Sequence, residues 1–390
     1  MEKKRSHFSG RLGFILAAAG SAVGLGNIWR FPYLAAKYGG GLFLIIYLIL
    51  VFTLGYTVMT SEIAIGRKTG QSPWNAFAQL NKKYKFIGII LSIVPFIILS
   101  YYSVIGGWVI KYLCTYLTGG HAAAAGDDFF SNFISQPFEP LIWAVVFVLL
   151  CFIVVVRGVK NGIEKASKIL MPVLVLLSIA VAVFSVIQPG AMEGVKYFLI
   201  PNFSDFKPET ILAAMGQMFY SLSLAMGIMI TFSSYLKKED DIEKSVGRIE
   251  LFDTAIAILA GLMIIPAVSA FNNGDMSKMN AGPGLMFQTL PKVFDSMGMG
   301  TIVGVLFFLL VLFAAATSAI SLMEAVVATV CDKTRLSRTQ STILVTVGAI
   351  LLGIPSSLGN GVLADFTIFG FQFLDFMDFI TNAVLMPIGA

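Results

Sequence analysis

The chain alternates long apolar runs with short polar connections along its whole length. The apolar runs lie near residues 11–36, 41–65, 86–118, 140–157, 166–187, 211–235, 249–271, 300–330, 339–355 and 366–390. A helix needs about 20 residues to cross a bilayer, and most of these runs reach that length. Because backbone polar groups in lipid must be satisfied within their own segment, we expect ten membrane-spanning α-helices.

The composition agrees with this pattern. Of 390 residues, 57% are hydrophobic and 13% are charged, whereas soluble domains carry about 25% charged residues. The net charge of +5 is not gathered on one soluble face, so we expect no nucleic-acid partner. The cysteines and histidines have no metal-binding spacing, and no nucleophile lies beside a base at membrane depth. We therefore expect a polytopic membrane protein that is not an enzyme.

Basic residues concentrate in alternate connections between the runs. They are Lys3, Lys4, Arg5, Arg67, Lys68, Lys82, Lys83, Lys85, Arg157, Lys160, Lys165, Lys168, Lys237, Lys238, Lys244, Arg248, Lys333, Arg335 and Arg338. Cytoplasmic loops of membrane proteins carry an excess of lysine and arginine. We therefore expect a multi-pass protein of the inner (plasma) membrane, in contact with its lipid, with a cytoplasmic N-terminus.

The first apolar run contains residues that an ordinary membrane anchor does not need. Gly20, Gly24 and Gly26 fall in its middle, and Asn27 and Arg30 follow them. Glycine weakens a helix, and each freed backbone group in lipid needs a partner. Close helix packing through Gly20 and Gly24 is one explanation, but polar groups at this depth are costly and usually functional. We expect a break whose carbonyls and amides face an ion or a ligand.

The segment G-S-A-V-G-L-G-N-I-W-R-F-P, residues 20–32, resembles the first-span signature of the neurotransmitter:sodium symporter family. The resemblance covers nearly the whole chain and implies an all-α polytopic membrane protein with the leucine-transporter fold. That fold has two inverted repeats of five helices, with discontinuous first and sixth helices. Gly216 and Gly227 interrupt the sixth run, as the fold requires.

The resemblance also sets the expected domain organisation. We expect one transporter domain over residues 1–390, with a first repeat at about 11–187 and a second at about 211–390. Family members usually have eleven or twelve spans, whereas the tenth apolar run here still continues at residue 390. We therefore expect a shortened tenth helix.

Two sodium sites are implied by the resemblance, built from the oxygen atoms that hard cations prefer. The first would use the substrate carboxylate, the carbonyl of Ala22 and the side chains of Asn27, Ser221 and Asp253. The second would use the carbonyls of Gly20, Val23 and Ala314 and the hydroxyls of Thr317 and Ser318. Judged by residue type alone, the two hydroxyls could equally bond to the preceding helical turn or join two helices.

A substrate pocket beside these ions is implied as well. The amides of Leu25 and Gly26, at a half-helix start, and the hydroxyl of Tyr102 would hold a carboxylate. An ammonium group would bind the carbonyls of Ala22, Tyr220 and Ser221 and the hydroxyl of Ser223. The substrate side chain would contact Ser21, Ile98, Tyr220, Met226, Ser318 and Leu322. Met226 stands where the family often has phenylalanine, and its flexible thioether leaves room for a bulky apolar or aromatic side chain.

Gates on both sides complete the implied site. Arg30 and Asp378 would pair across the outer entrance, and Arg5, Asp332 and Tyr235 would close the cytoplasmic side. Glu62 would hold backbone amides at the helix breaks in a structural role. Without the resemblance, Arg5 and Asp332 are equally well explained as solvated charges, because exposed pairs contribute little.

These features together imply a sodium-coupled symporter that imports a neutral, hydrophobic or aromatic L-amino acid by alternating access. Animal relatives require chloride, but here Asp253 stands at the usual asparagine position, near Tyr47 and Gln217, and Ala257 follows one turn later. A carboxylate in this low dielectric would repel chloride, so we expect chloride-independent transport with Asp253 as the fixed negative charge. Asp253 either takes up a proton when its cation leaves or never titrates. The alternatives are a non-transporting amino-acid receptor and a channel-like protein.

Overall fold

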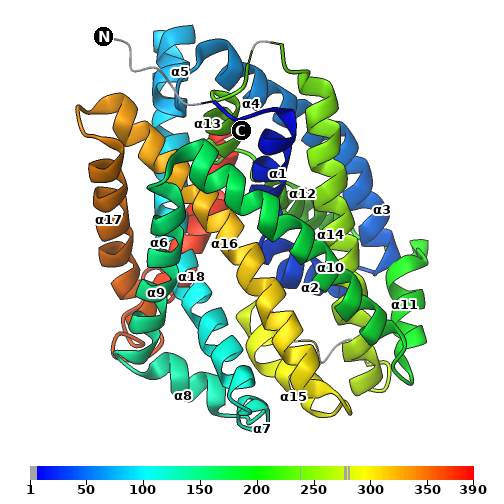
Figure 1. The fold of residues 1–390 in the computed structure, drawn as a ribbon. Coiled ribbons are helices and arrows are strands. Elements are labelled where there is room, and N and C mark those ends of the chain that lie inside the picture. Colours follow the sequence, from blue (N-terminus) through cyan, green and yellow to red (C-terminus); the bar gives the residue numbers. More distant parts are fainter. Residues whose placement is uncertain (1–6, 238, 276–278, 280–281) are drawn as a thin grey trace.

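The computed structural model describes residues 7–237, 239–275, 279 and 282–390, and these residues are folded almost entirely into helices (Figure 1). Apart from the isolated bridges Gly40–Pro201 and Ile368–Phe371, the described ranges contain no β-structure. This confirms the predicted all-α fold class. Arg5, predicted as a gate residue, lies outside the described residues.

Each predicted apolar run contains helix. In chain order the helices are α1 (Arg11–Ala22), η1 (Gly26–Arg30), α2 (Phe31–Lys37), α3 (Gly41–Leu50), η2 (Val51–Gly55), α4 (Tyr56–Thr69), η3 (Lys82–Tyr84), α6 (Lys85–Leu117), α9 (Glu139–Val155), η4 (Val159–Glu164), α10 (Lys165–Val186), α12 (Pro208–Ser221), α13 (Ile228–Ser233), α14 (Ile242–Phe271), α16 (Gly300–Lys333), α17 (Arg338–Leu358), α18 (Phe373–Phe379), η8 (Ile380–Leu385) and α19 (Met386–Gly389). Shorter helices in the connections are α5 (Pro73–Leu80), α7 (His121–Ala124), α8 (Phe129–Ser135), α11 (Ala191–Leu199), η5 (Phe203–Asp205), η7 (Leu285–Thr289) and α15 (Leu290–Asp295).

Seven continuous helices in the described part of the chain are long and apolar enough to cross a membrane. An eighth span is the pair Arg11–Ala22 and Gly26–Lys37, which is bent by 52° at its break. The sixth run is also broken, between Ser221 and Ile228. The predicted discontinuity of the first and sixth helices is therefore present.

The start of the tenth helix differs from the prediction. The apolar run begins near residue 366, but helix begins only at Phe373. Phe369 and Gly370 both have left-handed φ angles, 52° and 83°, and the bridge Ile368–Phe371 closes a tight turn around them. Hydrophobicity alone does not distinguish this turn from a helix.

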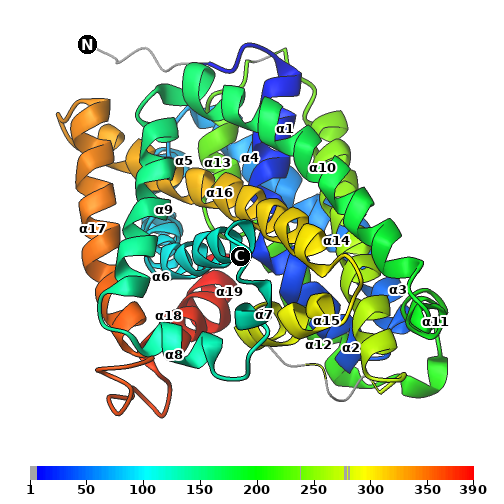
Figure 2. The ribbon, with the colours of Figure 1, turned by 60° about the horizontal axis from the view of Figure 1, so that its bottom comes forward.

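The two broken helices lie inside the bundle (Figures 1 and 2). Helix α1 packs against α10, α14 and α16, and α13 packs against α4 and α16. Large apolar side chains on α9, α10 and α17, such as Leu149, Leu176 and Leu351, are instead exposed, as expected for faces that meet lipid. The long helices thus form a scaffold around two interrupted ones.

Candidate functional site

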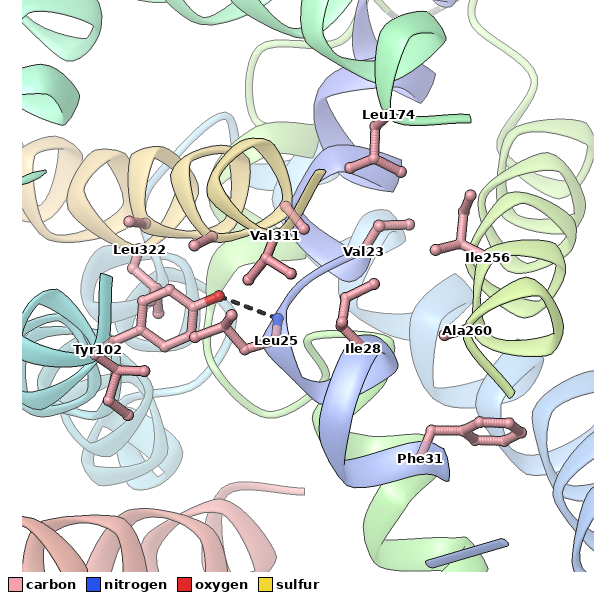
Figure 3. Packing of buried hydrophobic residues seen from close by; sticks show 14 of the residues in the cluster. Val23, Leu25, Ile28, Phe31, Tyr102, Leu174, Ile256, Ala260, Val311 and Leu322 are labelled. Atoms are coloured by element: carbon pink, nitrogen blue, oxygen red, sulfur yellow. Dashed lines mark hydrogen bonds between the residues drawn. The ribbon is translucent and has the colours of Figure 1, made fainter. Parts of the chain in front are cut away.

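The interruption of the first helix exposes backbone groups in the centre of the protein. Figure 3 shows this segment between Val23 and Ile28, with Tyr102 and Leu322 on one side and Ile256 on the other. The N–H of Gly24 donates to the Asn27 side-chain oxygen at 3.0 Å, and the N–H of Leu25 donates to the Tyr102 hydroxyl at 3.3 Å. These bonds partly replace those lost where the helix opens.

The interruption of the sixth helix lies against the first. The Ser223 hydroxyl donates to the carbonyl of Ser21 at 3.0 Å, and the Ser21 hydroxyl donates to Ser223 at 3.2 Å. From α4, the Glu62 carboxylate accepts the N–H of Ala225 at 2.7 Å. Among the described residues Glu62 forms no hydrogen bond to the first helix, so its hydrogen bond is to the sixth-helix break.

The two interruptions border a small cavity. It is lined by Ser21, Ala22, Gly24, Leu25, Gly26, Ile98, Tyr102, Tyr220, Ser221, Ser223, Met226, Ile228, Ser318 and Leu322. This lining includes every residue that the family resemblance grouped around a substrate, and it contains no Asp, Glu, His, Lys or Arg side chain. Gly24 and Ile228 are additional. Gly24 is one of the glycines that indicated the first break, whereas Ile228 is the first residue of α13 after the second break and had no sequence signal beyond that position.

The carboxylate of Asp253 in α14 lies beside this cavity and is fully buried. It accepts hydrogen bonds from the Asn27 amide at 2.7 Å, the Ser221 hydroxyl at 2.9 Å and the Tyr47 hydroxyl at 3.2 Å. Charge-assisted bonds of this kind favour the ionised carboxylate. The Asn27 oxygen points instead at the N–H of Gly24. Asn27, Ser221 and Asp253, predicted together as one ion site, are thus within hydrogen-bonding distance of one another.

The residues of the second predicted ion site also lie together, between α1 and α16. The Ser318 hydroxyl donates to the carbonyls of Ser21 and Val23 at 3.0 and 3.2 Å. The Thr317 hydroxyl donates to the carbonyls of Phe313 and Ala314 in the preceding turn, at 3.0 and 3.1 Å. A Cβ atom at Gly20 would lie 3.3 Å from Thr317, so the first helix approaches α16 closely here. The set offers carbonyl and hydroxyl oxygens, the donor type that sodium prefers.

The two residues predicted to form an outer gate, Arg30 and Asp378, line one cavity without forming a direct ion pair. This cavity is separate from the one between the helix breaks, and Tyr102 and Tyr220 also line it. Among the described residues Arg30 and Asp378 form no ion pair within 4.0 Å, which differs from the prediction. The Arg30 guanidinium lies 5.3 Å over the Tyr220 ring and donates to the carbonyl of Gly216 at 3.3 Å.

Asp378 has its own partners on the other side of that cavity. It accepts hydrogen bonds from the Tyr101 hydroxyl at 3.0 Å and the Asn382 amide at 2.6 Å. Both charged groups therefore have separate partners in this conformation.

A buried ion pair that sequence reasoning missed lies at the opposite end. Glu324 of α16 pairs with Arg338 of α17, and it also accepts the Tyr235 hydroxyl at 2.7 Å. Arg338 further donates to the carbonyl of Val155 at 2.8 Å. The sequence signal that could have identified Glu324 is its position as an acidic residue inside an apolar run. Asp332, the predicted partner of Arg5, accepts the N–H of Ser72 at 2.9 Å.

Comparisons with known proteins identify the class to which this fold and site belong. The model of the sodium:neurotransmitter symporter family matches residues 5–132 and 131–386. The chain belongs to this family, as predicted, and is a multi-pass sodium-dependent transporter rather than an enzyme.

Particular relatives agree with this assignment. The chain is 40% identical over 394 residues to the uncharacterized sodium-dependent transporter YhdH of Bacillus subtilis, covering 100% of this chain and 86% of the relative. It is 35% identical over 408 residues to an uncharacterized sodium-dependent transporter of Methanocaldococcus jannaschii, covering 99% and 80%. The crystal structure of MhsT in complex with L-phenylalanine matches with a TM-score of 0.89 and 43% identity, covering 99% of this chain and 88% of that one.

Proposed function

We propose that this protein is a symporter that couples sodium entry to import of a neutral, hydrophobic or aromatic L-amino acid by alternating access. The observation that carries the proposal is the cavity between the two helix breaks. It combines the amides of Leu25 and Gly26 and the Tyr102 hydroxyl, suited to a carboxylate, with apolar side chains such as Met226. The similarity to MhsT, whose complex contains L-phenylalanine, supports this substrate class.

Counterflow in proteoliposomes tests this proposal. Vesicles preloaded with unlabelled phenylalanine should accumulate labelled phenylalanine only when the protein and sodium are present. A receptor would bind the label without accumulating it, and a channel would produce single-channel currents without requiring a substrate. Either result would contradict the symporter proposal.

We further propose two sodium ions per cycle, held by the groups around Asp253 and around Thr317 and Ser318. Two charges that enter across 100 mV release about 4.6 kcal/mol. Because 1.4 kcal/mol corresponds to a factor of ten, this sustains a substrate gradient of roughly a thousandfold before any sodium gradient is added. The ratio of labelled sodium to substrate entering the vesicles measures the stoichiometry.

We also propose that transport does not require chloride, because Asp253 supplies the negative charge beside the first sodium ion. Ala257, one turn further along α14, offers no polar group to an anion. Relatives at lower identity include the sodium- and chloride-dependent GABA transporter ine of Drosophila melanogaster, at 27%. Uptake with gluconate in place of chloride should therefore match uptake in chloride, and its loss would overturn this proposal.

The orientation that we propose places the N-terminus in the cytoplasm and the protein in the inner (plasma) membrane, with inverted repeats at about 11–187 and 211–390. Arg30 and Asp378 would then meet across the outer entrance once substrate is bound. The Tyr235, Glu324 and Arg338 cluster would lie on the cytoplasmic side, with Asp332. Labelling of single cysteines placed in the connections, from one side of the membrane at a time, tests the orientation.

A further inference from the structure

Glu250 of α14 is a buried acidic side chain that none of these sites uses. Its side chain is fully buried, and neither carboxyl oxygen has a hydrogen-bond partner among the described residues. Asp253, one turn further along the same helix, has three side-chain donors. An ionised carboxylate that is buried without any partner is strongly unfavourable. The Glu250 carboxyl therefore needs a positive partner that the side chains of the described residues do not supply.

The surroundings of Glu250 are rich in oxygen. Residues at positions i, i+3 and i+4 of a helix share one face, which places Glu250, Asp253 and Thr254 together on α14. Thr254 is also buried, and its hydroxyl has no hydrogen-bond partner in the described part of the chain. Asp253 and Tyr47 are close enough to act electrostatically on Glu250, and neither carries a positive charge.

Several basic side chains on the helices that pack against α14 have other partners. From α1, Arg11 donates through Nε to the Ser245 hydroxyl, although its Nη2 has no hydrogen-bond partner among the described residues, and from α4, Arg67 donates to the carbonyl of Asp240. From α10, Lys168 pairs with Glu164. From η1, Arg30 lies over Tyr220, and the acidic Glu62 of α4 binds the N–H of Ala225. No described residue of these elements forms an ion pair with Glu250.

We propose that Glu250 binds a monovalent cation, either a proton or a sodium ion, at a position distinct from the two proposed sodium sites. A proton needs one carboxyl oxygen and leaves the side chain neutral. A sodium ion needs several oxygens, of which Glu250 supplies two and Thr254 one. The position lies one turn from Asp253 towards the start of α14, the end that our orientation places in the cytoplasm. A cation that leaves Asp253 in that direction would meet the Glu250 carboxyl.

Spectroscopy and sodium binding on the purified protein test the binding step without relying on transport. Three variants are compared with the native protein: Glu250→Gln; Glu250→Met, which keeps the volume without polar atoms; and Glu243→Gln, an exposed acid in the first turn of α14 that serves as the control. If a proton is bound, the infrared carbonyl band of a buried carboxylic acid is present at neutral pH and is lost in both Glu250 variants. If sodium is bound, equilibrium binding of labelled sodium falls by one ion per protein in the same variants. In both cases Glu243→Gln should behave as the native protein. If neither measurement changes in the Glu250 variants, the proposal is overturned.

Thermal unfolding separates a binding role from a structural one. In sodium-free buffer, where no bound sodium ion adds stability, removing an unpartnered buried carboxyl should leave the unfolding midpoint of Glu250→Met at or above that of the native protein. A large fall would show that the carboxyl has protein partners, which contradicts the proposal.

We expect the cation bound at Glu250 to move during transport, and this expectation rests on the proposed symport function. In proteoliposomes, the Glu250→Gln variant should retain sodium-dependent substrate binding while one proton or one sodium ion per substrate is lost from the coupled flux. If the native protein transports no amino acid, the symport proposal fails, yet the infrared and sodium-binding results still decide whether Glu250 binds a cation.

Discussion

The two broken helices leave helical geometry in different ways. In the first, the break between Ala22 and Gly26 is short, and neither Gly24 nor Gly26 has a left-handed φ angle. In the second, the longer break from Ser221 to Ile228 passes through left-handed angles at three residues: Ser223 at 53°, Ala225 at 56° and Gly227 at 69°. Two of these three are not glycine, which makes that conformation costly.

Glycine therefore has a different purpose in each break. A Cβ atom at Gly24 would lie 2.6 Å from the Ser318 hydroxyl, and one at Gly26 would lie 2.6 Å from the Tyr220 ring. The first break needs glycine for space, because other side chains approach its backbone. Asn27, two residues beyond that break, also satisfies the N–H of Gly24 within the same segment.

The second break is held mainly by contacts with other elements. Glu62 of α4 accepts the N–H of Ala225, and Ser223 bonds to Ser21 of α1. Left-handed geometry costs about 1–2 kcal/mol for each non-glycine residue, so these contacts must offset that cost. The comparison shows that the first break satisfies one of its amides within its own segment, through Asn27, whereas the hydrogen bonds that hold the second break come from other elements.

The largest effect is expected from removing space at the first break. Gly24→Ala puts a methyl group against Ser318 and 3.2 Å from the Tyr102 hydroxyl, both in the cavity wall. Overpacking of about 3 kcal/mol would weaken sodium-dependent binding of labelled phenylalanine by roughly 100-fold. The control is Gly247→Ala, where an added Cβ meets nothing within 4 Å. Native affinity in Gly24→Ala would show that space is not the reason for glycine.

The next largest effect concerns the groups that we assign to sodium. Asn27→Ala removes a donor to Asp253 and the acceptor for Gly24, and Thr317→Ala removes a hydroxyl at the second ion site. Each should raise the sodium concentration required for half-maximal substrate binding by about tenfold or more, as loss of a bond to a charged group does.

The matched control for Thr317→Ala is Thr329→Ala in the same helix, whose hydroxyl also bonds to the preceding turn, at 3.0 Å from the Ala325 carbonyl. If both threonine variants raise the sodium concentration for half-maximal binding equally, Thr317 has only a structural role. Substrate binding by the native protein that is as tight in potassium as in sodium would overturn the assignment altogether.

A smaller effect should come from the side chain between the left-handed residues of the second break. Met226 lines the cavity, and a rigid phenyl ring at this position would occupy space that the flexible thioether leaves open. Met226→Phe should shift preference from tryptophan and tyrosine towards leucine and alanine by a few-fold to tenfold, or about 1 kcal/mol. A competition panel of these four amino acids measures the shift, and an unchanged ranking would mean that Met226 does not contact the substrate.

The smallest effect is expected from relieving the left-handed backbone conformation of the second break, which the first break lacks. Ala225→Gly relieves the left-handed strain but adds freedom to the unfolded chain, so the net gain should be about 0.5 kcal/mol. A small rise in the thermal unfolding midpoint in detergent would report it. The control Ala260→Gly, at a buried helical position in α14, should cost about 1 kcal/mol. Equal destabilisation by both would show that the contacts from Glu62 and Ser223 leave no strain at residue 225.

The sequence by itself determined the helices and the family. Lipid obliges each spanning segment to satisfy its own backbone, so an apolar run of sufficient length predicts a helix, although not the residue at which that helix begins. The glycines and Asn27 of the first span predicted its break, because glycine weakens a helix and freed backbone groups in lipid need partners. The family resemblance of residues 20–32 grouped residues that line one cavity.

Only the tertiary structure decided which groups meet. It separates Arg30 from Asp378, joins Glu324 to Arg338, and leaves Glu250 without a partner among the described residues. It also holds Ser223 and Ala225 in left-handed conformations that their residue types disfavour. The physical reason is that these contacts join side chains of different helices. Their energies depend on how the helices pack, which no local pattern of apolar and polar residues contains.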